Sequence, residues 1–156
     1  MDAERQHEAV RLPEGSWWDW DVVAWDAAEL RLAASYDLTF LHGLELVFGD
    51  PTLVSCPAKF LDPVFRAPTS EELARVTRQI GEEPPVLVAF ETDAGGLEPV
   101  CCLIAAERIE VVQETVLRYW RDDAAPGQRF APWVRSPAPG RRRLGGIEPH
   151  ETRSTF

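Results

Sequence analysis

The sequence has little lysine, cysteine and histidine, and it has no long hydrophobic run. Its 16 basic residues include a single lysine, Lys59, which indicates a bacterium with a GC-rich genome because arginine codons are GC-rich. No apolar stretch reaches the roughly 18 residues that a membrane span needs. The first residues are polar and acidic, whereas a secretory signal is basic and then apolar. We therefore expect a cytoplasmic protein without a membrane partner.

Motifs for nucleotides and metals are also missing. The chain contains neither Gly-x-x-x-x-Gly-Lys nor Gly-x-Gly-x-x-Gly, which excludes these two phosphate-binding loops. The three cysteines lack Cys-x-x-Cys spacing, and the three histidines have no second ligand at the usual distance. Neighbouring strand residues point to opposite faces, so a bridge between Cys101 and Cys102 would be strained. We predict reduced thiols, no metal and no cofactor.

Charge is spread unevenly along the chain. Residues 1–120 carry 22 acidic and nine basic residues, a balance of −13, whereas residues 121–156 carry four acidic residues and seven arginines, a balance of +3. An acidic body repels phosphate and attracts basic proteins over long range. The charge pattern therefore predicts a basic protein partner and no nucleic-acid binding by the globular body.

Length and composition predict a single domain. A chain of 156 residues that is 45% apolar suits one core of ordinary size. We expect residues 1–15 to be a flexible lead-in and residues 16–120 to be the globular domain. Residues 121–156, rich in arginine and proline, form a tail that is disordered or loosely docked.

Hydrophobic alternation predicts mostly strands. The segments that carry it are residues 17–25, 29–33, 36–41, 44–48, 52–56, 85–91 and 98–105. Residues 69–80 have the capping residues of a helix, and the three prolines of residues 57–68 predict an ordered loop. Residues 107–120 favour a strand, with a helix as the alternative. Together these predict an α+β fold, a mostly antiparallel sheet or flattened barrel of about seven strands with one main helix.

The first predicted strand carries the candidate partner site. If it is regular, Trp18, Trp20, Val22 and Ala24 share the core face. The opposite face then presents a row of two aromatic and two acidic side chains, Trp17, Asp19, Asp21 and Trp25. Tryptophans contribute much of the energy of interface hot spots, and acids steer basic partners. We predict partner binding by this row, unless a second layer covers the tryptophans.

Two other functions stay open. A small enzyme or ligand carrier with an aromatic-lined pocket in the sheet would use Tyr36, His42 and Cys56. His42 and Cys56 are also ordinary residue types for a turn and for a core, so no catalytic residue is predicted and an enzyme is disfavoured. An accessory subunit would use its basic tail, which includes the run from Arg141 to Arg143.

One part of the chain resembles other bacterial proteins. Residues 44–48, 54–57 and 60–66 read LELVF, VSCP and FLDPVFR. These runs resemble a segment of small acidic bacterial proteins of unknown function, some of them proposed immunity proteins of polymorphic toxin systems. The resemblance implies a non-enzymatic, immunity-like protein whose acidic face blocks a toxin domain, and it assigns no residue a role.

Overall fold

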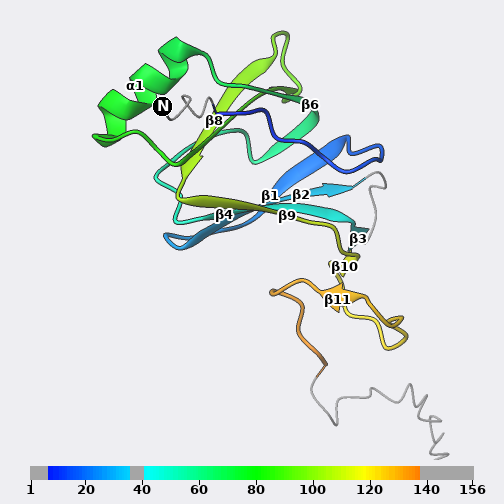
Figure 1. Ribbon diagram of the computed structural model, residues 1–156. Helices are drawn as coiled ribbons and strands as arrows, with labels where there is room; N and C mark the ends of the chain where they lie inside the picture. The colour runs from blue at the N-terminus through cyan, green and yellow to red at the C-terminus, as the bar shows by residue number, and fades with distance from the viewer. Residues whose placement is uncertain (1–6, 36–40, 138–156) are drawn as a thin grey trace, which may run out of the picture.

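The computed structural model describes residues 7–35 and 41–137, which form an antiparallel β-structure with one helix (Figure 1). The elements in chain order are β1 (Asp19–Trp25), β2 (Glu29–Ser35), β3 (Leu41–His42), β4 (Leu44–Gly49), β5 (Leu53–Ser55), β6 (Lys59–Arg66), α1 (Ser70–Ile80), β7 (Val86–Asp93), β8 (Val100–Ala106), β9 (Arg108–Val112), β10 (Val116–Leu117) and β11 (Arg129–Phe130). The predicted α+β class, with a mostly antiparallel sheet and one main helix, is confirmed. No helix in these residues is long and apolar enough to cross a membrane.

The main sheet curls until its two ends meet. Its eight strands follow the order β5-β8-β7-β6-β1-β2-β4-β9. Short connections join β4 to β5 and β8 to β9. At one end of the sheet β5 pairs with β8, and at the other end β4 pairs with β9. A hydrogen bond from Glu107 N to the carbonyl of Gly49 (3.0 Å) joins the two bent strands at their corner. The sheet therefore closes into a flattened barrel, which protects most strand edges.

Side chains fill the interior of the barrel. Alternate residues of β1, β2, β4, β6, β7 and β8 form one buried apolar cluster. Trp20 lies at its centre, stacked on Phe60 with ring centroids 6.0 Å apart, and Phe90 packs against Phe60. The barrel is thus a packed core, as small barrels usually are.

Helix α1 covers part of the outside. Thr69 and Glu72 form a reciprocal capping box at its start, and Gly81, in the left-handed conformation at φ 88°, ends it. Val76, together with half-buried Leu73 and Ile80, packs on outward-facing residues of β7 and β8. The helix predicted over residues 69–80 is confirmed. It leaves the far ends of β7 and β8 uncovered.

The loop predicted over residues 57–68 is wrong, because most of this segment forms strand β6. A β-bulge between Leu61 and Val64 absorbs Pro63, and Asp62 takes the left-handed conformation there at φ 48°. Proline cannot donate a ladder hydrogen bond, and a bulge is where a strand tolerates it. The prolines therefore mark an irregularity within the strand and not its absence.

The end of the described chain forms a second, smaller layer. The segment predicted as a strand over residues 107–120 is β-structure, but it is divided into β9 and β10. β10 pairs with β3 and with β11, making a three-stranded sheet at one end of the barrel (Figure 1). Ala131 is buried and Phe130 stacks on Trp120, so this part of residues 121–137 is packed against the protein. Residues 36–40, part of another predicted strand, lie outside the described residues.

Candidate functional site

The outer face of β1, β2 and β4 carries a polar cluster under the C-terminal segment, residues 113–137. The strand register places Asp21, Ala33 and Glu45 in one row across the three strands. Ala33 is fully buried although it points away from the barrel interior. Arg118 and Arg129 of the C-terminal segment reach Asp21 and Glu45 on either side of Ala33.

Glu45 is the centre of the cluster and is 2% exposed. It accepts hydrogen bonds from His42 Nε2 (2.8 Å), Arg31 Nη1 (2.9 Å) and Arg129 Nη2 (2.5 Å). A buried carboxylate is tolerated only when it is paired and hydrogen-bonded, and here three donors from three parts of the chain satisfy it. Glu45 thus connects β2, β3 and β11.

The pKa of Glu45 depends on two opposing effects, burial and the contacts with His42 and Arg129. Burial raises the pKa of its carboxyl, but the hydrogen bond from His42 and the charge and hydrogen bond of Arg129 lower it more strongly. The result is a pKa lowered from 4.5 to about 2. Glu45 is therefore ionised throughout the physiological pH range.

His42 is fully buried and its two ring nitrogens have different partners. Arg118 Nε lies 3.1 Å from Nδ1, and Nε2 faces Glu45. A guanidinium can only donate, so Nδ1 must accept and Nε2 must carry the proton that is donated to Glu45. The network therefore holds His42 as the neutral Nε2–H tautomer.

Arg118 extends the network to the first strand. Its Nη1 and Nη2 atoms contact the two carboxylate oxygens of Asp21 at 3.2 and 2.8 Å. This two-pronged contact is the geometry in which arginine binds carboxylates most specifically. Asp21, a predicted partner-binding acid, is thus already bound by the protein's own C-terminal segment.

The predicted row of Trp17, Asp19, Asp21 and Trp25 is not a single row. A β-bulge shifts the register between Val22 and Ala24, so Trp25 pairs with Leu30 and falls on the face of Trp20. Asp19 and Asp21 stay on the outer face, beside Ser35 and Ala33. The assumption of a regular strand is therefore corrected, and Trp25 is separated from the two acids.

Trp17 is half-buried and not part of an open patch. Its indole Nε1 donates to the carbonyl of Pro13 (3.0 Å), and the side chain packs against the barrel core. The ring passes so close to Gly15 and Gly43 that a Cβ at either position would lie 2.9 or 3.2 Å from it. Both glycines therefore make room for this tryptophan.

Of the alternative pocket residues that the structure describes, His42 and Cys56 do not line one pocket. Tyr36 lies outside the described residues, and His42 is sealed in the ionic network. Cys56 lines a separate hollow of about 390 Å³ with Val22 and Trp25. Burial raises the pKa of the Cys56 thiol to about 11, so at neutral pH it is protonated and a poor nucleophile.

No metal-binding cluster is present among residues 7–35 and 41–137. No family model, curated protein or solved structure matches this chain. Its function must therefore be inferred from its own surfaces.

Sequence reasoning missed Arg31, Arg118 and Arg129, which are the cations of the network. One sequence feature could have predicted buried arginine partners: Glu45 lies inside an otherwise apolar strand, and a buried acid requires cationic partners. The opposite charge of body and tail was a second signal. Both point to contacts within the chain, which cannot be paired without the tertiary structure.

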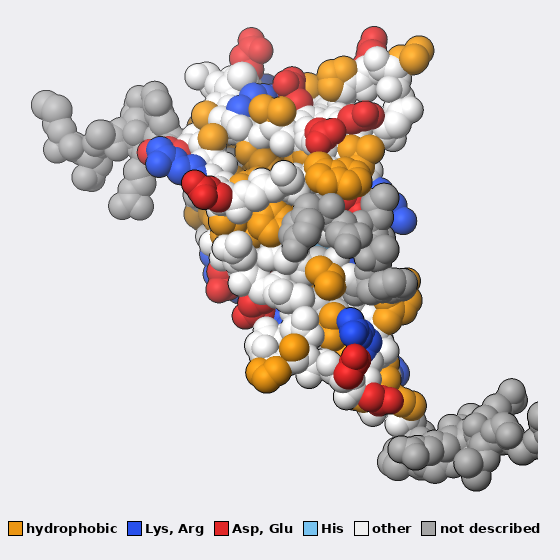
Figure 2. Space-filling view, turned by 90° about the vertical axis from the view of Figure 1, so that its right-hand side faces the viewer, with side chains coloured by type: hydrophobic (Ala, Val, Ile, Leu, Met, Phe, Trp, Pro, Cys, Tyr) orange, Lys and Arg blue, Asp and Glu red, His pale blue; other side chains and the backbone are white. Residues whose placement is uncertain are grey.

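One outward surface remains exposed and acidic. We call it the hairpin surface; it comprises Asp19, Leu61, Val64, Glu91 and Asp93 on the strands and Leu97 and Glu98 in the β7–β8 turn. The register places Asp19, Leu61 and Asp93 side by side across β1, β6 and β7. Figure 2 shows acidic and hydrophobic side chains, with basic atoms among them, on the upper part of the face that it presents.

Proposed function

We propose that this protein is a non-enzymatic acidic binding protein, of the immunity type, that engages a basic protein partner through the hairpin surface. The observation that carries the proposal is the mixture of exposed apolar and acidic side chains there. Val64 is 64% exposed and Leu97 fully so. Elsewhere on the outer face, α1 packs on β7 and β8, and the C-terminal segment contacts Asp21 of β1 and Glu45 of β4.

The charges of this surface suit a basic partner. Within the described residues, Glu91, Asp93 and Glu98 form no ion pair, although Glu91 interacts electrostatically with Arg66. Glu91 accepts a weak hydrogen bond from Cys101, and Asp93 accepts one from Gly95 N. Lys59 lies at the border, where it pairs in register with Asp21. Unpaired acids attract a basic surface during approach, and the apolar side chains supply burial on contact.

This surface replaces part of the site predicted from sequence. Asp19 belongs to it, whereas Asp21 is bound by Arg118 and Trp25 lies on the other face. An immunity protein, which the sequence resembles, would use such a surface to block a basic toxin domain. A cytoplasmic location is part of the proposal, and the three free cysteines support it.

The test is affinity capture from the native cell lysate at low and high salt. The double variant Glu91→Lys with Asp93→Lys changes the hairpin surface. Glu82→Lys with Glu107→Lys changes the net charge equally at exposed sites elsewhere. We expect the wild type and the control to capture one stoichiometric basic protein that salt releases, and the hairpin variant to lose it.

Equal capture by the hairpin variant would contradict the proposed surface. Capture of no basic protein by the wild type would contradict the proposed function.

A further inference from the structure

A long hollow separates the N-terminal segment, residues 7–11, from strands β7 and β9. It has a volume of about 1030 Å³, at the upper end of the range of small-molecule sites. Its walls are mostly apolar and include Val10, Pro84, Pro85, Val86, Ile109 and Val111. Val111 is 42% exposed although it pairs with core residue Leu46 on the neighbouring strand, so the hollow leaves apolar surface in contact with water.

One residue that lines this hollow, His7, has a polar side-chain atom without a partner. His7 Nε2 lies 2.9 Å from the carbonyl oxygen of Pro84, which can only accept, so Nε2 carries the proton. In the neutral ring Nδ1 is then an acceptor. It is buried without a hydrogen-bond partner, the one side-chain nitrogen or oxygen of the described residues in that state. An unsatisfied buried acceptor is unfavourable until a donor reaches it.

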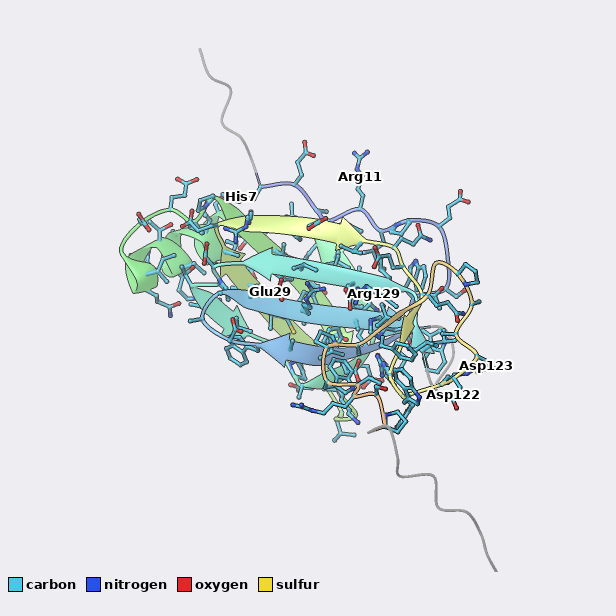
Figure 3. All side chains as sticks on the ribbon, turned by 90° about the horizontal axis from the view of Figure 1, so that it is seen from below. His7, Arg11, Glu29, Asp122, Asp123 and Arg129 are labelled. Carbon is cyan, nitrogen blue, oxygen red and sulfur yellow. The ribbon has the colours of Figure 1, made fainter. Side chains whose placement is uncertain are left out.

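The charged residues around the hollow limit which polar group a ligand can carry. Glu8 and Glu83 line it and disfavour an anion. Arg11 also belongs to the lining, but its side chain points away from the sheet, whereas the His7 ring points toward it (Figure 3). The lining therefore combines the His7 ring with two carboxylates and one guanidinium, and the guanidinium points away from the sheet (Figure 3).

We propose that this hollow binds a single-chain aliphatic amphiphile whose head donates a hydrogen bond, that is, an alcohol or an amine. The chain lies along the apolar walls and the head group donates to His7 Nδ1. The hydrogen bond to Pro84 places the proton of the neutral ring on Nε2 and orients the ring. The site is independent of the hairpin surface.

The experiment measures binding of octanol, octylamine and octanoate to the full chain by calorimetry. These probes share one chain length and differ in the head group. Val111→Trp fills the hollow, and Gln79→Trp is the control at an exposed residue of α1, outside both the hollow and the hairpin surface. His7→Phe keeps a ring but removes the acceptor.

We expect octanol and octylamine to bind the wild type about tenfold more tightly than octanoate, the value of one well-made hydrogen bond. Val111→Trp should abolish binding and Gln79→Trp should leave it unchanged. His7→Phe should weaken octanol about tenfold and remove the preference over octanoate.

Failure of octanol to bind the wild type, equal affinity for octanoate, or unchanged binding by Val111→Trp would each overturn the proposal. The comparison of head groups uses the wild type, so it decides the question even if His7→Phe loosens the N-terminal segment.

Discussion

Arg118 Nε donates a hydrogen bond to Nδ1 of His42, a residue 76 positions earlier in the chain, and so fixes the tautomer of a fully buried histidine. The same guanidinium binds Asp21, which makes Arg118 the link between the C-terminal segment, β3 and β1. This contact joins the start of the C-terminal segment to the outer face of the barrel.

Replacing Arg118 should loosen the C-terminal segment. Arg118→Ala removes the partner of half-buried Asp21 and leaves His42 Nδ1 without a donor, which should lower the free energy of unfolding by about 2 kcal/mol. Urea denaturation measures this loss, and limited proteolysis within residues 121–137 should become faster. Arg121→Ala, which removes an exposed pair with Asp123, is the control and should change neither. Equal protease resistance in the two variants would show that Arg118 does not anchor the segment.

Replacing Glu45 should destabilise the fold more strongly. Glu45→Gln retains the shape of the side chain but leaves Arg31 and Arg129 facing an uncharged amide in a buried place. We expect a loss of about 3 kcal/mol at neutral pH, measured by urea denaturation. Glu110→Gln, at an exposed site on adjacent β9, should be neutral within error. A neutral Glu45→Gln variant would mean that the network contributes no net stability.

The same carboxylate should make stability depend on acid. Its pKa is about 2 in the folded protein and 4.5 ordinarily, so the unfolded chain binds more protons between these values. Stability from Glu45 is therefore complete above about 4.5 and is lost as the pH falls toward 2. Unfolding free energies measured across this window should fall less steeply for Glu45→Gln than for the wild type. Glu72, held by Arg66, contributes in the same direction and persists in the variant. Identical slopes would contradict the assignment.

The three thiols should differ in reactivity. Burial raises the pKa of Cys56 to about 11 and that of Cys102 to about 12, whereas the Cys101 side chain is exposed. Thiolates are the reactive form, so iodoacetamide should label Cys101 first, and mass spectrometry of the native protein measures the order. Cys101→Ser should remove the fast phase alone. Early labelling of Cys56 would indicate an accessible, activated thiol and would revive the pocket hypothesis.

A side chain at Gly43 should destabilise the folded protein. A Cβ there would lie 3.2 Å from the Trp17 ring, which Gly15 confines on another side, so the ring has little freedom to move. Gly43→Ala should lower the free energy of unfolding by about 1 kcal/mol and change the tryptophan fluorescence. Gly96→Ala, with nothing within 4 Å of the added carbon, serves as the control. An unchanged spectrum and stability in Gly43→Ala would show that Trp17 adapts.

Much of the fold followed from local patterns. The capping residues Thr69 and Glu72 and the terminal Gly81 predicted α1, because these signals act within one turn of the helix. Alternation in residues 85–91 and 98–105 predicted the β7–β8 hairpin for the same reason. Strand β6 was missed because Pro63 reads as a breaker, and only pairing with β1 and β7 shows that a bulge accommodates it.

The candidate site followed less well from sequence. The acids of β1 were recognised, but the bulge after Val22 removed Trp25 from their face, and a shift of one residue reverses every side chain beyond it. The partner of Asp21 was unforeseen because Arg118 follows it by 97 residues.

The sequence by itself determined the composition and fold class of the protein: an acidic, strand-rich chain with one capped helix. Composition, alternation and capping are local properties, and they persist in any arrangement of the strands. The tertiary structure decided which acids are satisfied within the chain and which remain exposed. Charge pairing depends on distances across the closed barrel, where Glu45 and Asp21 meet arginines of the C-terminal segment while Glu91 and Asp93 form no ion pair within the described residues. Position in the fold, and not residue type, therefore separates a structural carboxylate from one available to a partner.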